Sequence, residues 1–424
     1  MAQSFSVGSA AVEITPSKPA YLAGYYYDRL STAIHDPLLA RCLAVSDGKT
    51  TVALCVGDII DLPRNAVEQT RRLVQQRCGL PPECLILSAI HTHTAPDPDR
   101  ETEYTAGLPE LLAQGVSRAV TGLVPQEIRT GRAEENTLQY IRRFRMRDGS
   151  VRTNPGIGNP EVVLPIGAVD PSVSVVLAGQ GGKISGGLVH FGLHCDTVGG
   201  TEISADWTHY LRQAVVQGLG GKPVLLTPIG TCGDVNHWNV FRNVSLRGFA
   251  ETERIGTKVA QAALEAAGRA TVVEPGRVMG LRQEITASIR VPSEAELAAA
   301  KTLMATPPPD GVDFTMDRVI AGRQVAAAAI GPTLKTEITV LTFGSVAIVG
   351  VPTEYFTALG RQIKNRSPFP QTIIVTLANG NVGYVGERHN YEEEGGYEMT
   401  SAPTCPGTGE LIADTAVDLL RRAG

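Results

Sequence analysis

Two pairs of histidines in this 424-residue chain have spacings that could hold a metal ion. His91 and His93 follow one apolar run, and His190 and His194 end another. Positions i and i+2 of a strand share a face, so His91 and His93 can point into one pocket. Strand ends are where α/β proteins place their sites, and imidazole is a common Zn²⁺ ligand. The pattern predicts a zinc site with an open position, but each pair is also compatible with ordinary buried histidines, and the spacing does not say which of the four bind.

Three further polar clusters follow apolar runs in the C-terminal half. Gly233 and Asp234 form a turn whose backbone N–H groups could face an anion or a carbonyl oxygen, although a tight turn with an Asp cap has the same composition. Glu354 follows a run that ends at residue 351, and it fits either a metal ligand or a helix-start carboxylate. Tyr384 follows the strand-like run 372–377 in a segment dense in turn residues, where a partly buried tyrosine is the ordinary interpretation.

The elements that must position these residues alternate between strands and helices. Apolar runs predict strands at 5–14, 40–46, 51–56, 84–90, 173–178, 187–193 and 224–228, and a buried strand or strand pair at 338–352. Helical spacing predicts helices at 64–78, 102–124, 207–219, 248–267, 293–304, 355–365 and 408–422. Interleaved strands and helices predict an α/β protein with mixed sheets flanked by helices. The basic segment 140–147, YIRRFRMR, is typical of a solvated edge strand. The segment 306–313 is the best loop candidate, and without a good linker we expect one domain over 1–424.

Composition excludes several classes of protein. Hydrophobic residues make up 43% and charged residues 19%, which is too apolar for a disordered chain. A net charge of −5 disfavours a nucleic-acid partner. The longest apolar run is shorter than the roughly 20 residues of a membrane helix, so we expect no integral membrane segment. No signal peptide is visible, which favours the cytoplasm and leaves open secretion with the signal removed. Seven scattered cysteines without a CxxC motif suggest free thiols in a reducing compartment.

The ordered set of motifs resembles the neutral/alkaline, non-lysosomal ceramidase family. Similar segments are VEITP at 12–16, LAGY at 22–25, HDPLLAR at 35–41, LSAIHTHTAP at 87–96, SAD at 204–206 after His194, GDV at 233–235, PTEYFT at 352–357, and 379–398 with its tyrosines and Tyr-Glu pair. They keep the family's order and cover nearly the whole chain. The order of the set, more than any single motif, carries the resemblance.

The resemblance implies a zinc-dependent amidohydrolase, a metal-dependent hydrolase of linear amide C–N bonds. One Zn²⁺ per chain would be held by His91, His194, Glu354 and Tyr384. His93 matches the second histidine of the family's HTH motif, which sits beside the metal and assists the chemistry. A zinc ion activates water and polarises the amide carbonyl, His93 can move protons, and Tyr384 can stabilise the oxyanion.

The same resemblance implies substrate contacts. Arg142 lies near a substrate-binding arginine of the family, with Arg143 as the alternative, and we expect Gly233, Asp234 and Tyr397 to contribute as well. N–H groups near Gly233 could join Tyr384 in holding the oxyanion.

Departures from the family pattern point to an altered substrate. Thr94-Ala95 replaces Ser-Gly, Asn236-His237 replaces Ser-Pro, aromatic residues make up only 5%, and the sequence leaves no room for the family's C-terminal immunoglobulin-like domain. We therefore expect a small-molecule or lipid-like amide, with short N-acyl amides preferred over long-chain ceramide. The alternatives are a zinc hydrolase of an ester, lactone or cyclic amide, and a non-catalytic binding protein.

Overall fold

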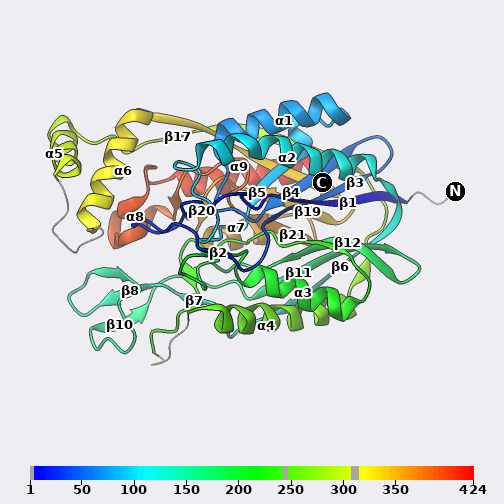
Figure 1. Ribbon diagram of the computed structural model, residues 1–424, viewed down its shortest axis with the longest axis horizontal. Helices are drawn as coiled ribbons and strands as arrows, with labels where there is room; N and C mark the ends of the chain where they lie inside the picture. Colours follow the sequence, from blue (N-terminus) through cyan, green and yellow to red (C-terminus); the bar gives the residue numbers. More distant parts are fainter. Residues whose placement is uncertain (1–3, 242–246, 307–314) are drawn as a thin grey trace.

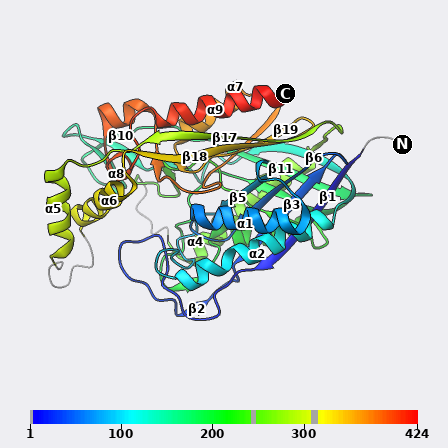
Figure 2. The same cartoon turned by 90° about the horizontal axis from the view of Figure 1, so that it is seen from above.

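Two β-sheets stacked face to face, with helices on both outer faces, form the architecture of the chain (Figure 2). The structure is a computed structural model that describes residues 4–241, 247–306 and 315–424. Within these ranges the arrangement confirms the predicted α/β class of mixed sheets flanked by helices. No helix in the described ranges combines the length and apolarity needed to cross a bilayer. All seven cysteines are free thiols.

The first sheet is long, mixed and mostly antiparallel. Its strand order is β14-β12-β11-β6-β1-β3-β4-β5, and β16 pairs with β6; only β4–β5 and β12–β14 are parallel. The strands are β1 (Phe5–Glu13), β3 (Leu39–Ser46), β4 (Thr51–Gly57), β5 (Leu85–Ala89), β6 (Val124–Glu134), β11 (Ser172–Gln180), β12 (Lys183–His190), β14 (Val224–Leu226) and β16 (Thr271–Val272). Its outer face is covered by α1 (Arg64–Cys78), α2 (Thr102–Thr121), α3 (Trp207–Leu219) and α4 (Phe249–Gly268).

The second sheet has the order β17-β18-β19-β21. Its strands are β17 (Val278–Ser288), β18 (Thr333–Phe343), β19 (Val346–Gly350) and β21 (Gln371–Val375), and it is covered by α7 (Thr357–Arg366) and α9 (Thr408–Ala423). Side chains alternate between two cores: Ile348 and Val375 pack toward the first sheet, whereas Val349 and Ile374 pack with the helices. Both faces are therefore apolar, which explains the continuous apolar run at 338–352 and confirms it as a buried strand pair.

Shorter elements gather at one end of the sandwich (Figure 1). Three are strand pairs: β2 (Ala33–Ile34) with β13 (Glu202–Ile203), β7 (Tyr140–Ile141) with β15 (Val235–Asn236), and β20 (Glu354–Tyr355) with β22 (Tyr384–Val385). A small sheet consists of β8 (Arg143–Met146), β9 (Val151–Thr153) and β10 (Val162–Pro165). The helical elements are α5 (Glu294–Ala305), α6 (Met316–Ile330), α8 (Tyr397–Ser401) and the π-helical turn Asn390–Glu394. A 3₁₀ turn, Pro82–Cys84, precedes β5.

Several predicted boundaries were wrong for identifiable reasons. The helix expected at 102–124 ends at Thr121, because Val124 already begins β6. The helix expected at 355–365 starts at Thr357, because residues 354–355 are drawn into the β20–β22 pair. Strands β6 and β17 were not predicted, because charged residues interrupt their apolar pattern. Most of the predicted loop 306–313 lies outside the described residues.

Candidate metal centre and active site

The polar residues singled out from the sequence come from strand ends in both sheets. β5 leads into His91 and His93, and β12 leads into His194. β19 leads to Glu354, which is the direct register partner of Tyr384 in the parallel β20–β22 pair. The two sheets thus bring five candidate groups together from segments almost 300 residues apart in sequence.

Three of these histidines form a compact, buried cluster. One ligand nitrogen from each of His91, His93 and His194 lies within 4.8 Å of the others. Ring centroids are 4.7 Å apart for His91 and His194, and 5.0 Å apart for His91 and His93. Glu354 Oε2 lies 3.2 Å from His91 Nε2 and 3.8 Å from His194 Nε2. The arrangement is a set of nitrogen and oxygen donors of the kind that binds Zn²⁺.

Backbone carbonyls orient two of the three histidines. His91 Nδ1 lies 2.9 Å from the carbonyl oxygen of Ile60, and His194 Nδ1 lies 3.4 Å from that of Cys232. A carbonyl only accepts, so the proton belongs on Nδ1 and Nε2 is left as an electron-pair donor facing Glu354. His93 has no hydrogen-bond partner on either ring nitrogen, although both atoms are buried. Its Nδ1 lies 3.8 Å from the carboxylate oxygen Oδ1 of Asp196, so packing and this nearby carboxylate orient the ring.

The backbone at His91 is itself unusual. Its φ is +63°, a region that non-glycine residues seldom adopt and that costs of order 1–3 kcal/mol. The His91 N–H donates to the carbonyl of Ile59 at 3.0 Å, and Ile90 N–H donates to that of Gly57 at 3.0 Å. These bonds hold the turn that directs the imidazole into the cluster.

The donors present fit a divalent metal ion. Glu354 Oε2 is buried without a hydrogen-bond partner, as are both ring nitrogens of His93. Leaving a buried carboxylate oxygen unsatisfied is unfavourable, and a cation among the three histidines would satisfy it. Burial alone would raise the pKa of Glu354, but His91 and Arg142 outweigh it and hold that pKa at about 2. Glu354 is accordingly an anion ready to bind a cation.

A second wall of the site consists of buried ion pairs. Arg142 and Arg143 are only 6% and 1% exposed, so the interpretation of residues 140–147 as a solvated edge strand was wrong. Arg142 Nε donates to Glu398 Oε1 at 2.8 Å, and its guanidinium carbon lies 5.1 Å from the centre of the Tyr384 ring. Its Nη2 is buried without a partner. Arg142 and Arg143 are thus neutralised inside the protein, whereas Arg147 at the end of the segment is 71% exposed.

In Arg143 the unpartnered nitrogen is Nε, which lies 3.5 Å from Glu398 Oε2, and both terminal nitrogens are engaged. Its Nη1 donates to Glu394 Oε2 at 2.9 Å, and its Nη2 donates to the Gly395 carbonyl at 2.8 Å. Of the two arginines considered from the sequence, Arg142 is therefore the one with a terminal nitrogen left to contact a ligand.

Gly233 and Asp234 support the segment that carries Glu354. Gly233 N–H donates to the carbonyl of Tyr355 at 3.0 Å, so among the N–H groups near Gly233 that were expected to face an oxyanion, that of Gly233 itself is already engaged. A Cβ at position 233 would lie 2.4 Å from the Glu354 carbonyl oxygen, which explains the glycine. Asp234 Oδ1 accepts from the N–H and the hydroxyl of Thr357, each at 2.9 Å. Both residues hold the backbone at Tyr355 and Thr357, directly after Glu354.

An aromatic loop, residues 24–27, borders the cluster and was not predicted from the sequence to be part of the site. Gly24 has a φ of +93°, and a Cβ there would lie 2.4 Å from the His93 ring. The Tyr25 and His93 rings are 5.7 Å apart. The Tyr26 hydroxyl contacts that of Tyr397, whose ring lies 5.6 Å from the ring of Tyr384. The LAGY motif at 22–25 was the available signal.

His190 lies outside the cluster. It is 3% exposed, and its Nε2 lies 2.8 Å from the carbonyl oxygen of Ile374 in the second sheet. Among the four histidines whose roles the spacing left open, His190 is thus a core residue that joins the two sheets.

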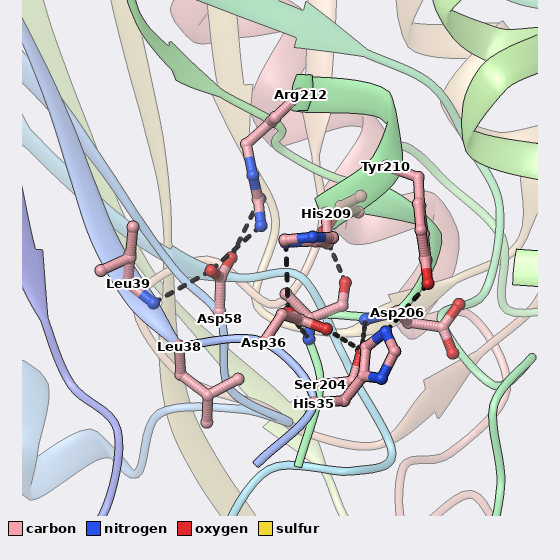
Figure 3. A network of polar contacts seen from close by, with 12 residues as sticks. His35, Asp36, Leu38, Leu39, Asp58, Ser204, Asp206, His209, Tyr210 and Arg212 are labelled. Atoms are coloured by element: carbon pink, nitrogen blue, oxygen red, sulfur yellow. Dashed lines mark hydrogen bonds and ion pairs between the residues drawn. The ribbon is translucent and has the colours of Figure 1, made fainter. Parts of the chain in front are cut away.

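A buried polar network around Asp36 and Ser204 (Figure 3) lies behind the His91–His93 segment and is bonded to it through Thr92 and Thr94. The Asp36 carboxylate accepts from the Ser204 hydroxyl at 2.5 Å and from the Ala205 N–H at 2.9 Å. The Ser204 carbonyl in turn accepts from the hydroxyls of Thr92 and Thr94, at 2.7 and 2.9 Å. The HDP and SAD motifs of the sequence therefore act by positioning the HTH segment.

The fold is that of a neutral-ceramidase-like catalytic domain. The crystal structure of neutral ceramidase from Pseudomonas aeruginosa matches all of this chain and 75% of its own, with a TM-score of 0.75 and 18% sequence identity. A ceramidase complexed with C2 matches 99% of this chain and 76% of its own, with a TM-score of 0.71 and 18% identity. Neither a scan against protein-family models nor a search of curated proteins finds a match. At this identity the similarity establishes the fold, and the resemblance expected from the motifs is confirmed at that level.

Proposed function

We propose that this protein is a zinc-dependent hydrolase that cleaves an N-acyl amide to a carboxylate and an amine. The observation that carries the proposal is the buried cluster of His91, His93 and His194 with the unpartnered Glu354 oxygen beside it. The ceramidase fold supports amide hydrolysis as the reaction.

In this proposal His91, His194, Glu354 and Tyr384 hold one Zn²⁺ ion. Carbonyl-oriented Nδ1 atoms on His91 and His194 support their roles as Nε2 ligands. A bound Zn²⁺ supplies a Lewis acid that activates water and polarises an amide carbonyl. His93 as a third nitrogen ligand is the alternative that the compact triad leaves open.

The chain's own residues would divide the remaining work. His93 takes a proton from the attacking water and delivers it to the nitrogen of the leaving amine as the C–N bond breaks. Burial keeps the pKa of His93 well below its usual value, so the ring is neutral and able to accept. Arg142 Nη2, buried without a partner beside the Tyr384 ring, would donate to the carbonyl oxygen as negative charge develops on it.

The described walls of the site favour a small polar amide over a long acyl chain. Tyr25 lies beside His93, and Arg142 and Tyr397 lie beside Tyr384, so these neighbours bring hydroxyl and guanidinium groups to the site. Each methylene bound in an apolar groove contributes roughly 0.8 kcal/mol, which these polar walls do not supply.

A substrate panel with metal analysis tests the proposal. We expect about one zinc per chain and kcat/KM values that are higher for short N-acyl amides than for long-chain ceramide in micelles. A steep rise toward long-chain ceramide would contradict the small-substrate proposal alone. Preferred turnover of esters, lactones or cyclic amides would contradict amide specificity, and protein without stoichiometric metal would contradict the mechanism.

A further inference from the structure

A cavity of about 420 Å³ lies outside the active site, between α6, α8 and the segment that follows β17. Figures 1 and 2 both show α6 beside α8 at one end of the molecule. We call it the α8 cavity. The apolar part of its wall is formed by Val291, Pro292, Ile320 and Met399. Its volume is within the range of small-molecule sites.

Two polar groups in its wall lack partners. Ser401 is 1% exposed, and its hydroxyl has no hydrogen-bond partner. Arg323 Nε is likewise buried without a partner. The other nitrogens of Arg323 make only long contacts, at 3.4 Å to the Ser401 carbonyl and 3.3 Å to the Tyr26 hydroxyl. Unsatisfied buried donors are uncommon in folded proteins, so two in one cavity point to a ligand that accepts hydrogen bonds.

The charged side chains that line the cavity indicate whether the ligand is an anion or a cation. Arg323 has no ion-pair partner in the part of the chain that the structure describes, and neither does Arg290. Arg290 is satisfied by the carbonyls of Met399 and Ala402, each at 2.5 Å from its Nη2. Glu296 is the carboxylate that lines the cavity, and it accepts from Ser293 N–H at 2.8 Å. Two guanidinium groups against one carboxylate leave one positive charge.

We propose that the α8 cavity binds an organic monocarboxylate with an aliphatic chain. The carboxylate accepts from Arg323 Nε and from the Ser401 hydroxyl, and the chain lies along Val291, Ile320 and Met399. Charge-assisted hydrogen bonds from arginine suit a carboxylate, and the single net charge suits a monoanion. The histidines do not line this cavity, and α8 presents Glu398 to Arg142 but Ser401 to the cavity; Arg323 joins the two regions through the Tyr26 hydroxyl.

Calorimetric titration of octanoate into the full chain tests the proposal, with octanamide as a neutral probe of the same length. We expect octanoate to bind the unmodified protein and octanamide to bind at least about 10-fold more weakly. Arg323→Gln should weaken octanoate binding about 10-fold or more, and Ser401→Ala about 3-fold or more. Lys301→Gln removes an exposed charge from α5, outside the cavity lining, and should leave the affinity unchanged.

A titration of His91→Ala distinguishes this cavity from the proposed metal centre. Octanoate binding that survives His91→Ala supports the α8 cavity, whereas its loss would place the carboxylate at the histidines and overturn the proposal. Equal affinities for octanoate and octanamide, or no effect of Ser401→Ala, would also overturn it. Because Ser401→Ala removes a single oxygen atom, it is the smaller change to the fold. It therefore still tests the proposal if the Arg323→Gln variant fails to fold.

Discussion

The two walls of the candidate site are held in different ways. On the histidine wall, neutral hydrogen bonds fix the ligands: His91 to the Ile60 carbonyl, His194 to the Cys232 carbonyl, and the Thr92 hydroxyl to the Ser204 carbonyl. On the opposite wall, buried ion pairs hold the side chains in place: Glu398 accepts a hydrogen bond from Arg142 and lies 3.5 Å from Arg143 Nε.

The difference follows from what each wall must present. A metal ligand has to offer a lone pair, so a histidine is best oriented by an acceptor on its other nitrogen. Groups that hold a developing negative charge have to be donors fixed in advance, and a buried arginine needs a carboxylate partner to remain there. Substitutions on the two walls should therefore fail differently, by loss of metal on one and by loss of stability on the other.

The largest effect is expected inside the histidine wall itself. His91→Ala should abolish both stoichiometric zinc and activity, whereas His93→Ala should retain zinc and lose about 10²–10⁴-fold in kcat/KM, as for a missing proton carrier. Elemental analysis beside steady-state kinetics measures both quantities. His389→Ala, which removes a half-exposed histidine, is the control and should change neither. Equal zinc loss in the His91 and His93 variants would make His93 a ligand.

The opposite wall should respond mainly in stability. Glu398 is fully buried between two arginines, so Glu398→Gln leaves buried positive charge unpaired and should lower the free energy of unfolding by about 3–5 kcal/mol. Denaturant unfolding measures this. The control is Glu161→Gln, which breaks an exposed pair with Arg147 and should cost less than about 1 kcal/mol. Similar losses in both variants would show that the buried pairs are not what holds this wall.

The network behind the histidines should affect metal affinity more moderately. Asp36→Asn keeps the size of the side chain but replaces one acceptor oxygen with a donor, so Ser204 and Ala205 cannot both be satisfied. We expect zinc affinity to fall about 10- to 100-fold, as for other outer-shell changes. Competition with a chelator measures the affinity. Asp148→Asn alters an exposed turn carboxylate that also accepts a backbone N–H, and it should have no effect.

The histidine wall was easier to predict from the sequence than the charged wall. His91 and His93 are two residues apart after an apolar strand, so a local pattern was enough to place them together. Glu354 and Tyr384 were found through motifs, because their pairing across β20 and β22 depends on the second sheet. That geometry is nonlocal and leaves no periodicity in either segment.

The role of Arg142 could not be derived from its neighbours in sequence. Its partner Glu398 lies 256 residues away, so the basic segment looked solvated until the fold supplied the countercharge. The place of residues 24–27 beside the site could not be predicted for the same reason, because their contacts with His93 and Tyr397 join segments that are far apart in sequence. Strand and helix types, by contrast, followed from local periodicity, and α1 and α3 have the predicted limits.

The smallest effect concerns acid sensitivity behind the histidine wall, where Asp58 joins β3, β4 and α3. Burial alone would raise the pKa of Asp58, but Arg212 and Arg41 outweigh it and hold the pKa below its usual 3.8. Their nitrogens lie 3.1 and 2.8 Å from its carboxylate oxygens (Figure 3 draws the Arg212 pair). As the pH falls, Asp58 is therefore protonated in the unfolded chain before it is protonated in the folded one. The stabilisation from its ion pairs is complete above about pH 5 and is lost as the pH falls through the folded-state pKa of Asp58.

Asp58→Asn should remove that dependence, although it also lowers stability at neutral pH by leaving two arginines unpaired. Below pH 4 the free energy of unfolding of the unmodified protein should fall more steeply than that of the variant, by at most about 1.4 kcal/mol per pH unit for one group. Urea unfolding at several pH values measures the two slopes. Glu398→Gln serves as the comparison from the opposite wall and should retain the Asp58 contribution to the slope. Parallel pH profiles for Asp58→Asn and the unmodified protein would show that the acid sensitivity of the histidine wall arises elsewhere.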